Sequence, residues 1–531
     1  MIRKLDALVV GQGFGGMYML HRARGMGLQV LALEAGDDVG GTWYWNRYPG
    51  ARCDVMSIDY CYSFSNEIMQ EWTWKEQFAP QPEIWAYAKW VADKLDLRRD
   101  IQFNTRVTSA AFDDASQLWQ VQTDIGDVFE VTYLIMATGP LSIPKGLDVP
   151  GQEHFKGDIY LSGRWPQHPV DFAGKRVGLI GTGSTGVQIT PVVADQADAL
   201  VVFQRTPSFT FPMRNQKLDA DYVAQIKQHY PALRAFARNT ATGGVRATTS
   251  RPVFSVPVAE RERLMEEAWA HSGLAFIGLF ADTLINQQAN DVVADFVRGK
   301  IHDVVKDPAI AEILTPRGYP IFARRPCLET NYYEAFNREN VTLVDCINEP
   351  ILEITERGIR TGARVIDLDI IIAATGYDAL TGAMLAVDVK GKHGRSLRDK
   401  WANGAHSHLG LMVEGFPNLF MIAGANGPSA LANYLILNEQ NADWICACID
   451  FMRSHSHRTI EPTVEAEDRY MALLNAIASH TLMAKANTWY TGANIAGKPR
   501  NFPLFAGGLN KYLEICRDAA AGGYQGFEVQ P

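Results

Sequence analysis

The stretch ALVVGQGFGG, residues 7–16, decides the fold. An apolar run, residues 7–10, leads directly into glycines with the spacing G-x-G-x-x-G, and MYMLHRARGMG, residues 17–27, then has the pattern of a helix that ends at Gly25 or Gly27. Glycines permit a tight turn and let a pyrophosphate approach the backbone, while the start of the helix offers free N–H groups. The stretch therefore predicts a dinucleotide site at Gly11, Gly13, Phe14 and Gly16.

A second apolar strand, LQVLALEA at residues 28–35, follows this helix and carries Glu34 near its end. In dinucleotide-binding folds a carboxylate about 20 residues after the glycines accepts hydrogen bonds from the adenosine ribose. An isolated glycine pattern can equally be an ordinary loop. Strand, turn, helix, strand and acid together favour the binding site.

The same order returns in GKRVGLIGTGSTGVQITPVVADQADALVVFQRTP, residues 174–207. Here the second strand ends at Arg205, and arginine suits a 2′-phosphate that a carboxylate would repel. We therefore expect FAD at the first site and NADPH at the second. The alternative for Arg205 is an ordinary solvated surface charge. The candidate NADPH residues of this copy are Gly181, Thr182, Gly183, Ser184, Thr185, Gly186, Arg205 and Thr206.

Composition limits the possible partners. The 531 residues are 47% apolar and 21% charged, and the net charge of -9 argues against a nucleic-acid partner. The seven cysteines have no paired spacing, so we expect them to be reduced, in a cytoplasmic protein. With no run of about 18 apolar residues we expect no stable membrane insertion. His455 and His457 lack companion ligands, so we expect no metal site.

Longer motifs carry a family resemblance. GGTWYWNRYPGARCD (residues 40–54), FKGDIYLSGRWP (155–166), GFPNLFMIAGANGPSAL (415–431) and WYTGANIAGKPR (489–500) resemble the FAD- and NADPH-dependent Baeyer–Villiger monooxygenases of the cyclohexanone, phenylacetone and steroid monooxygenase type. The resemblance covers essentially the whole chain. It implies that NADPH reduces FAD, that a flavin peroxide forms with O₂, and that a ketone becomes an ester or lactone.

The fold that follows is α/β, a two-dinucleotide flavoprotein with a helical insertion. Two apolar strands end in Ala-Thr-Gly, in YLIMATGP (residues 133–140) and DIIIAATGYD (369–378), and the resemblance makes these the passages between domains. We expect an FAD domain from residues 1–143 and 377–531, an NADPH domain from 144–208 and 321–376, and a helical insertion at 209–320. The sequence leaves open a monomer or a small homo-oligomer.

The resemblance also assigns roles to individual residues. GYPIFARRPCLE, residues 318–329, implies that Arg325 stabilises negative charge in the reaction, that Arg324 contacts the 2′-phosphate, and that Asp54 pairs with and orients Arg325. From the residues alone, an ordinary surface Arg–Asp pair is the alternative. Further expected cofactor contacts are Thr42, Trp43, Tyr44, Tyr60 and Val107, with Trp489 on a mobile loop, although aromatic residues of this kind can also simply pack in a core.

Two positions depart from the family pattern. The signature F-x-G-x-x-x-H-x-x-x-W-P begins at Phe155 in a stretch without a regular period, which we expect to be a linker, and we place Tyr160 at its histidine. Met56 stands where members commonly carry glutamate, which would make that edge more apolar and favour a bulky or hydrophobic substrate. Two other functions stay open: oxidation of sulfur or nitrogen by the same chemistry, and an uncoupled NADPH oxidase or sensor, which Tyr160 favours.

Overall fold

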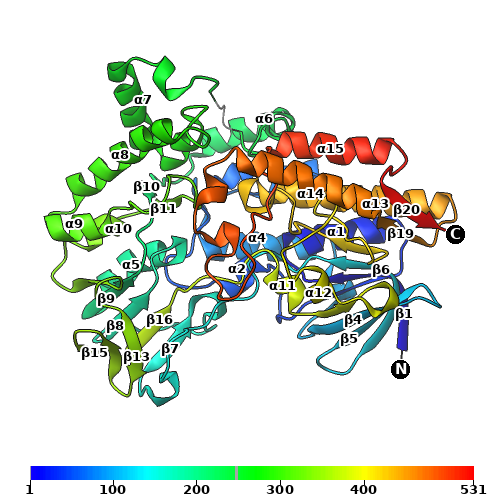
Figure 1. The fold of residues 1–531 in the computed structure, drawn as a ribbon, viewed down its shortest axis with the longest axis horizontal. Coiled ribbons are helices and arrows are strands. Elements are labelled where there is room, and N and C mark those ends of the chain that lie inside the picture. The colour runs from blue at the N-terminus through cyan, green and yellow to red at the C-terminus, as the bar shows by residue number, and fades with distance from the viewer. Residues whose placement is uncertain (1, 246–248) are drawn as a thin grey trace.

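The computed structural model describes residues 2–245 and 249–531, so residues 246–248 of the expected insertion lie outside the described residues. Two separate sheets organise the chain, one in each half of the molecule (Figure 1). The larger sheet has the order β17-β4-β5-β6-β1-β2-β3, and β18 also pairs with β6. Its strands are β1 (Ile2–Val10), β2 (Val30–Leu33), β3 (Ile101–Gln102), β4 (Val107–Asp113), β5 (Leu118–Thr123), β6 (Val128–Met136), β17 (Asp388–Lys390) and β18 (Leu419–Met421).

The predicted strand, glycine turn and helix are present, and they connect parallel strands of this sheet. β1 lies between β2 and β6, parallel to both, and α1 (Phe14–Gly25) follows the first glycine turn. The first half of β1 is largely exposed and its last four residues are buried, so an apolar pattern reveals only the buried half. Since β1 and β2 are joined through α1, the glycine turn lies at the carboxyl end of the sheet, where this class of fold binds ligands.

The smaller sheet is entirely parallel, in the order β12-β9-β8-β16-β7. Its strands are β7 (Asp158–Leu161), β8 (Arg176–Ile180), β9 (Ala199–Gln204), β12 (Val341–Asp345) and β16 (Ile370–Ala373), and α5 (Ser184–Gln196) follows the second glycine turn. The stretch that we expected to be a linker contributes an edge strand, because residues 158–161 pair with β16. Whether an edge segment forms a strand depends on the neighbouring strand with which it pairs, and that partner is not visible in the local sequence pattern.

Helices dominate the chain between β9 and β12. They are α6 (Ala220–Arg238), α7 (Val258–His271), α8 (Gln287–Val304), α9 (Pro308–Leu314) and α10 (Tyr332–Ala335), and Figure 1 shows α6, α7 and α8 at the top of the molecule. A short parallel pair, β10 (Thr210–Pro212) and β11 (Cys327–Glu329), joins the two ends of this region. The region has an apolar core of its own, which includes Phe211, Phe276 and Val293.

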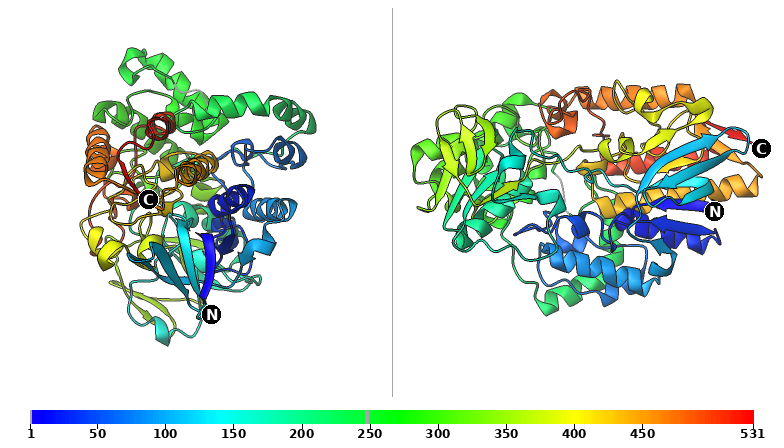
Figure 2. Two further views of the ribbon diagram at one scale, coloured as in Figure 1. Left: turned by 90° about the vertical axis from the view of Figure 1, so that its right-hand side faces the viewer. Right: turned by 90° about the horizontal axis from the view of Figure 1, so that it is seen from below.

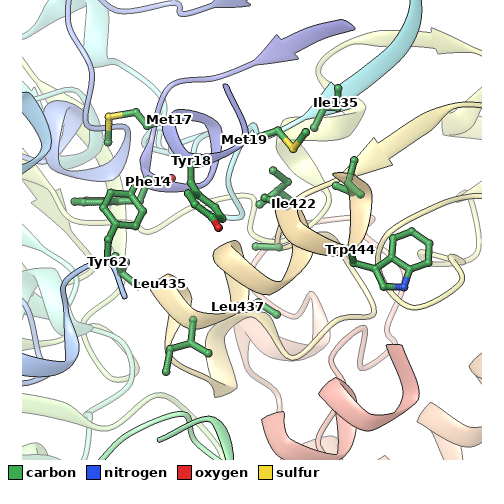
Figure 3. Close-up of a cluster of buried hydrophobic side chains, with 14 of the residues drawn as sticks. Phe14, Met17, Tyr18, Met19, Tyr62, Ile135, Ile422, Leu435, Leu437 and Trp444 are labelled. Atoms are coloured by element: carbon green, nitrogen blue, oxygen red, sulfur yellow. Dashed lines mark hydrogen bonds between the residues drawn. The ribbon is translucent and has the colours of Figure 1, made fainter. Parts of the chain in front are cut away.

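The chain returns to the first sheet at its C-terminal end. The remaining helices of the first half are α2 (Thr42–Trp45), α3 (Asn66–Glu71) and α4 (Gln81–Lys94), and those of the last part are α11 (Gly382–Leu385), α12 (Leu397–Lys400), α13 (Tyr434–Ser454), α14 (Val464–Ser479) and α15 (Leu509–Ala521). Helix α13 packs against α1, and Figure 3 shows Leu435 and Leu437 of α13 near Phe14, Tyr18 and Tyr62. The first glycine turn is therefore held from one side by a C-terminal helix.

Two small antiparallel sheets complete the fold. They consist of β13 (Ile351–Thr355), β14 (Gly358–Thr361) and β15 (Val365–Asp367), and of β19 (Thr459–Pro462) with β20 (Phe527–Gln530). The right view of Figure 2 shows the two halves side by side, and the left view shows helices of the helical region at the top of the molecule. No helix in the described residues combines the length and apolar character needed to cross a membrane.

Candidate active site

A cavity of about 870 Å³ lies where the two halves and the helical region meet. Its walls come from both glycine turns, the helical region and the C-terminal helices. Of the residues expected to bind cofactors or act in catalysis, the cavity brings together Gly11, Gly13, Phe14, Glu34, Thr42, Trp43, Asp54, Tyr60, Val107, Ser184, Arg325 and Trp489. The others lie outside the cavity wall: Gly16, Tyr44, Gly181, Thr182, Gly183, Thr185, Gly186, Arg205, Thr206 and Arg324.

The first glycine turn is open toward the cavity. Gly11 has a φ of +95°, and a Cβ there would lie 2.6 Å from the carbonyl oxygen of Ala137, so only glycine fits. Gly13 caps α1 without any side-chain hydrogen bond, and it lines the cavity with Phe14. The uncapped N-terminus of α1 therefore presents backbone N–H groups and the positive end of the helix dipole to an anion.

Glu34 is fixed at the end of β2. Its Oε2 accepts a hydrogen bond of 2.6 Å from the backbone N–H of Gln12, and its Oε1 accepts one of 2.8 Å from that of Gly36. Burial raises the pKa of Glu34, although these two N–H groups oppose the rise. The carboxylate thus links the glycine turn to the loop after β2, at one end of the cavity.

The second glycine turn has nearly the same backbone dihedral angles as the first at the residue that caps its helix. The caps of α1 and α5, Gly13 and Gly183, have φ/ψ of -74°/-171° and -77°/-170°. Gly181 has a φ of +113°, and a Cβ there would lie 2.4 Å from the carbonyl oxygen of Ala374, in the second Ala-Thr-Gly. Of this turn only Ser184 reaches the large cavity, and Arg205 is exposed at the end of β9.

Arg325 and Asp54 form a two-pronged ion pair inside the cavity. Nε of Arg325 donates to Oδ2 of Asp54 at 2.7 Å, and Nη2 donates to Oδ1 at 2.5 Å. The side chain of Asp54 is 14% exposed and that of Arg325 is 33% exposed. The carboxylate of Asp54 raises the pKa of Arg325, so the guanidinium is a permanent cation facing the cavity.

Arg324 points elsewhere, although it is adjacent in sequence. Its guanidinium lies over the ring of Tyr319 at 4.3 Å, and its Nη2 donates to the carbonyl of Asn487 at 3.2 Å. Asn487 lies two residues before Trp489, which begins a short 3₁₀ turn (Trp489–Thr491) and lines the cavity. Arg324 thus ties the segment that carries Trp489 to the segment just before β11.

The aromatic residues between β2 and α3 divide into two groups. Trp43 and Tyr60 line the cavity, and the indole Nε1 of Trp43 donates to the hydroxyl of Tyr60 at 2.8 Å. Tyr44 faces away, and its hydroxyl accepts a hydrogen bond of 3.0 Å from the side chain of Gln167. Met56 lies between the core of the first half and that of the helical region, outside the cavity wall.

Several lining residues had not been predicted. Gln188 of α5 accepts a hydrogen bond of 3.0 Å from the hydroxyl of Tyr48 and donates one of 3.0 Å to the carbonyl of Arg52. These three residues join the two halves beside the cavity. No local pattern signals them, because a glutamine on a helix has the same sequence context whether it contacts solvent or another domain.

The signature stretch requires a correction of one residue. Three residues separate Gly157 from the histidine in the signature, so the histidine position is Leu161 and not Tyr160. The ring of Tyr160 lies 5.4 Å from that of Trp165 and packs against the core of the smaller sheet. The departure is therefore from a hydrogen-bonding side chain to an apolar one, in register with Ala373 of β16.

Two glycine turns, each at the end of parallel strands in its own sheet and both reaching one cavity, define the class of two-dinucleotide-binding flavoproteins. The family described as flavin-binding monooxygenase-like matches residues 4–226. The chain is 40% identical over 527 residues to the acetone monooxygenase (methyl acetate-forming) of Gordonia sp. strain TY-5, covering 99% of each chain. It is 41% identical to a Baeyer–Villiger monooxygenase of Pseudooceanicola batsensis, covering 98% of this chain and 95% of that protein.

A solved structure of OTEMO in complex with FAD and NADP superimposes with a TM-score of 0.96, at 40% identity and with all of both chains covered. The chain belongs to the Baeyer–Villiger monooxygenase family. The resemblance and the fold class predicted from the sequence are thereby confirmed.

Proposed function

We propose that the protein is an FAD- and NADPH-dependent monooxygenase that inserts one oxygen atom of O₂ next to the carbonyl of a ketone, giving an ester or lactone. The observation that carries this proposal is the Arg325–Asp54 pair, which presents a permanent cation to a cavity shared with the first glycine turn. A fixed cation stabilises negative charge where it develops during oxygen transfer.

The residues around the cavity fit the two cofactors. FAD would lie along the uncapped N-terminus of α1, with Glu34 at its ribose and Trp43, Tyr60 and Val107 along its length. NADPH would lie on the N-terminus of α5, where Ser184 faces the cavity and Arg205 is exposed for a 2′-phosphate. When bound, FAD supplies oxygen activation and NADPH supplies the hydride.

The side chains then have separate tasks. Arg325 donates hydrogen bonds to negatively charged oxygen, and Asp54 keeps the guanidinium plane in one orientation. The apolar walls from Leu284, Leu431 and Met483 exclude water, which strengthens the field of the cation.

We assign residues 1–143 and 377–531 to an FAD domain, 144–208 and 321–376 to an NADPH domain, and 209–320 to the helical insertion. The membership of the two sheets supports this division, because the strands of the first lie within residues 2–136 and 388–421 and those of the second within 158–373.

We place the protein in the cytoplasm, which the seven free cysteines support. A monomer or a small homo-oligomer is compatible with this function.

One incubation tests the function. Purified protein with FAD, NADPH and O₂ is offered cyclic, aryl and polycyclic ketones and a thioether, and the products are identified by mass spectrometry. Ester or lactone formation supports the proposal. Sulfoxide without any ester would indicate a heteroatom oxidase, and NADPH consumption that yields only hydrogen peroxide would indicate an uncoupled oxidase.

A further inference from the structure

A turn that follows α6 forms part of the cavity wall. We call residues 240–244 the cavity turn; Ala241, Thr242 and Gly244 line the cavity. Helix α6 precedes this turn directly, so the position of the helix sets the position of the wall.

The cavity turn fits between the first residues of two C-terminal helices. The backbone N–H of Leu509, at the start of α15, donates to the carbonyl of Ala241 at 2.7 Å, and that of Asn433, the cap of α13, donates to the carbonyl of Thr242 at 2.8 Å. Gly243 has a φ of +71°, and a Cβ there would lie 2.7 Å from the side chain of Leu509. The turn is closely packed and tolerates little displacement.

Helix α6 has few apolar contacts to hold it. Of its 19 residues only Tyr230, Arg234 and Ala237 are buried, all in its C-terminal half. Arg234 is 3% exposed, and its Nη2 donates to the carbonyl of Ile58 and lies 2.6 Å from Sγ of Cys61. Its Nη1 is 3.9 Å from Oδ1 of Asp59, which is 2% exposed and lines the cavity.

Arg238 makes the second charged contact one helical turn later. Its Nη2 donates to Oγ of Ser63 at 2.6 Å and to Oε2 of Glu439 at 3.1 Å. Glu439 belongs to α13 and its side chain is 3% exposed, while the side chain of Arg238 is 42% exposed. The backbone N–H of Ser63 also donates to Glu439, at 2.5 Å.

Buried charges are costly unless their geometry is satisfied, so such a cluster fixes one arrangement of the elements that carry it. Here it connects α6, the 58–63 loop and α13, and the last two also contribute Asp59 and Asn438 to the cavity wall. The cluster lies at the C-terminal end of α6, just before the cavity turn. A shift of α6 would therefore move the wall.

We propose that Arg234 and Arg238 are positioning residues that hold the cavity turn against α13 and α15, and thereby keep this wall of the cavity in place and closed to water. The inference depends on the proposed ketone oxidation. The two residues do not touch the reacting atoms; they act through the turn.

The test uses Arg238→Gln, because its half-exposed side chain can be replaced without leaving a cavity. We expect the ketone KM to rise about fivefold, and the ester formed per NADPH to fall by a similar factor, since the loss of a partly buried ion pair is worth about 1 kcal/mol. Flavin content and the rate of flavin reduction by NADPH stay as in the wild type. Arg238→Lys, which keeps the charge, restores most of the coupling.

Arg22→Gln is the control for removing an arginine that pairs with α13. Arg22 of α1 pairs at 3.2 Å with Asp443 of α13, the helix that also carries Glu439, and the side chain of Arg22 is 43% exposed. Neither Arg22 nor Asp443 lines the cavity. If Arg238→Gln changes KM and coupling no more than this control does, the inference is wrong.

Gly243→Ala perturbs the turn directly and leaves both ion pairs in place. We expect it to reproduce the uncoupling, and unchanged coupling in this variant would also overturn the inference. A wild type that forms no ester from any ketone would instead overturn the proposed function, so the two failures are distinguishable.

Discussion

Replacing Arg325 by methionine tests the central element of the site. Methionine keeps much of the length of the side chain but removes the cation and both hydrogen bonds to Asp54. If the guanidinium stabilises developing negative charge, its loss slows oxygen transfer by about 10²–10³, or roughly 3–4 kcal/mol, as for the loss of an oxyanion donor. Delivery of hydride from NADPH precedes this need, so flavin reduction falls by less than about threefold.

The stability cost must be separated from the catalytic one. Asp54 is 14% exposed, and leaving such a carboxylate without its cation costs up to about 3–5 kcal/mol in a fully buried pair. A third of the Arg325 side chain is exposed, so we expect about 2 kcal/mol, which shows as a lower Tm.

The assay follows two quantities on the same preparation. Anaerobic stopped-flow measures the bleaching of the flavin after mixing with NADPH, and chromatography measures ester formed per NADPH under air. Arg176→Met is the control. Arg176 forms the same two-pronged ion pair with Asp369, in which its Nε donates to Oδ2 at 3.1 Å and its Nη2 donates to Oδ1 at 2.8 Å, and neither residue lines the cavity. Equal losses of reduction and ester formation, or ester yields above a tenth of the wild type, would refute the role of Arg325.

Other changes give independent checks. Glu34→Ala removes two hydrogen bonds to a charged group, so we expect FAD affinity to fall by about tenfold or more in a fluorescence titration, and an unchanged affinity would refute its role. Leu161→His restores the signature histidine and should raise ester yield per NADPH or leave it unchanged, while Tyr160→Phe, which keeps the ring packing, should leave both yield and Tm within error; a large fall for Tyr160→Phe would contradict the corrected alignment. Burial lowers the pKa of His408 to about 4, so the unfolded chain binds the proton first and stability falls by up to about 3 kcal/mol as the pH drops from 6.5 to 4; His408→Gln should flatten that part of the Tm profile, and an unaltered slope would count against it.

The elements that follow local rules were predictable from the sequence. Both strands that enter a glycine turn, and both helices that leave one, depend on residues within about 20 positions of each other. Glu34 was placed by its spacing alone and is found bonded to the glycine turn. Arg325 and Asp54 lie 271 residues apart, and the pair was expected only through the family resemblance.

Features that depend on distant partners were not predictable. The edge strand β7 exists because β16 offers it a pairing surface, and the start of β1 is a strand although its residues are mostly exposed. The wall formed by the cavity turn depends on where α6 is anchored. Charges that meet only in the folded chain, such as Arg238 and Glu439, leave no local signal.

The near-identity of the caps at Gly13 and Gly183 has a consequence for engineering. If one backbone shape serves both nucleotides, the choice between them is made outside the turns, by the sign of the charge after the second strand: Glu34 in one copy and Arg205 in the other. The residues that set coenzyme preference would then be separate from those that act in oxygen transfer. We expect an NADH-dependent form to be reachable by changing Arg205 and its surroundings, with Arg325, Asp54 and the first glycine turn left untouched.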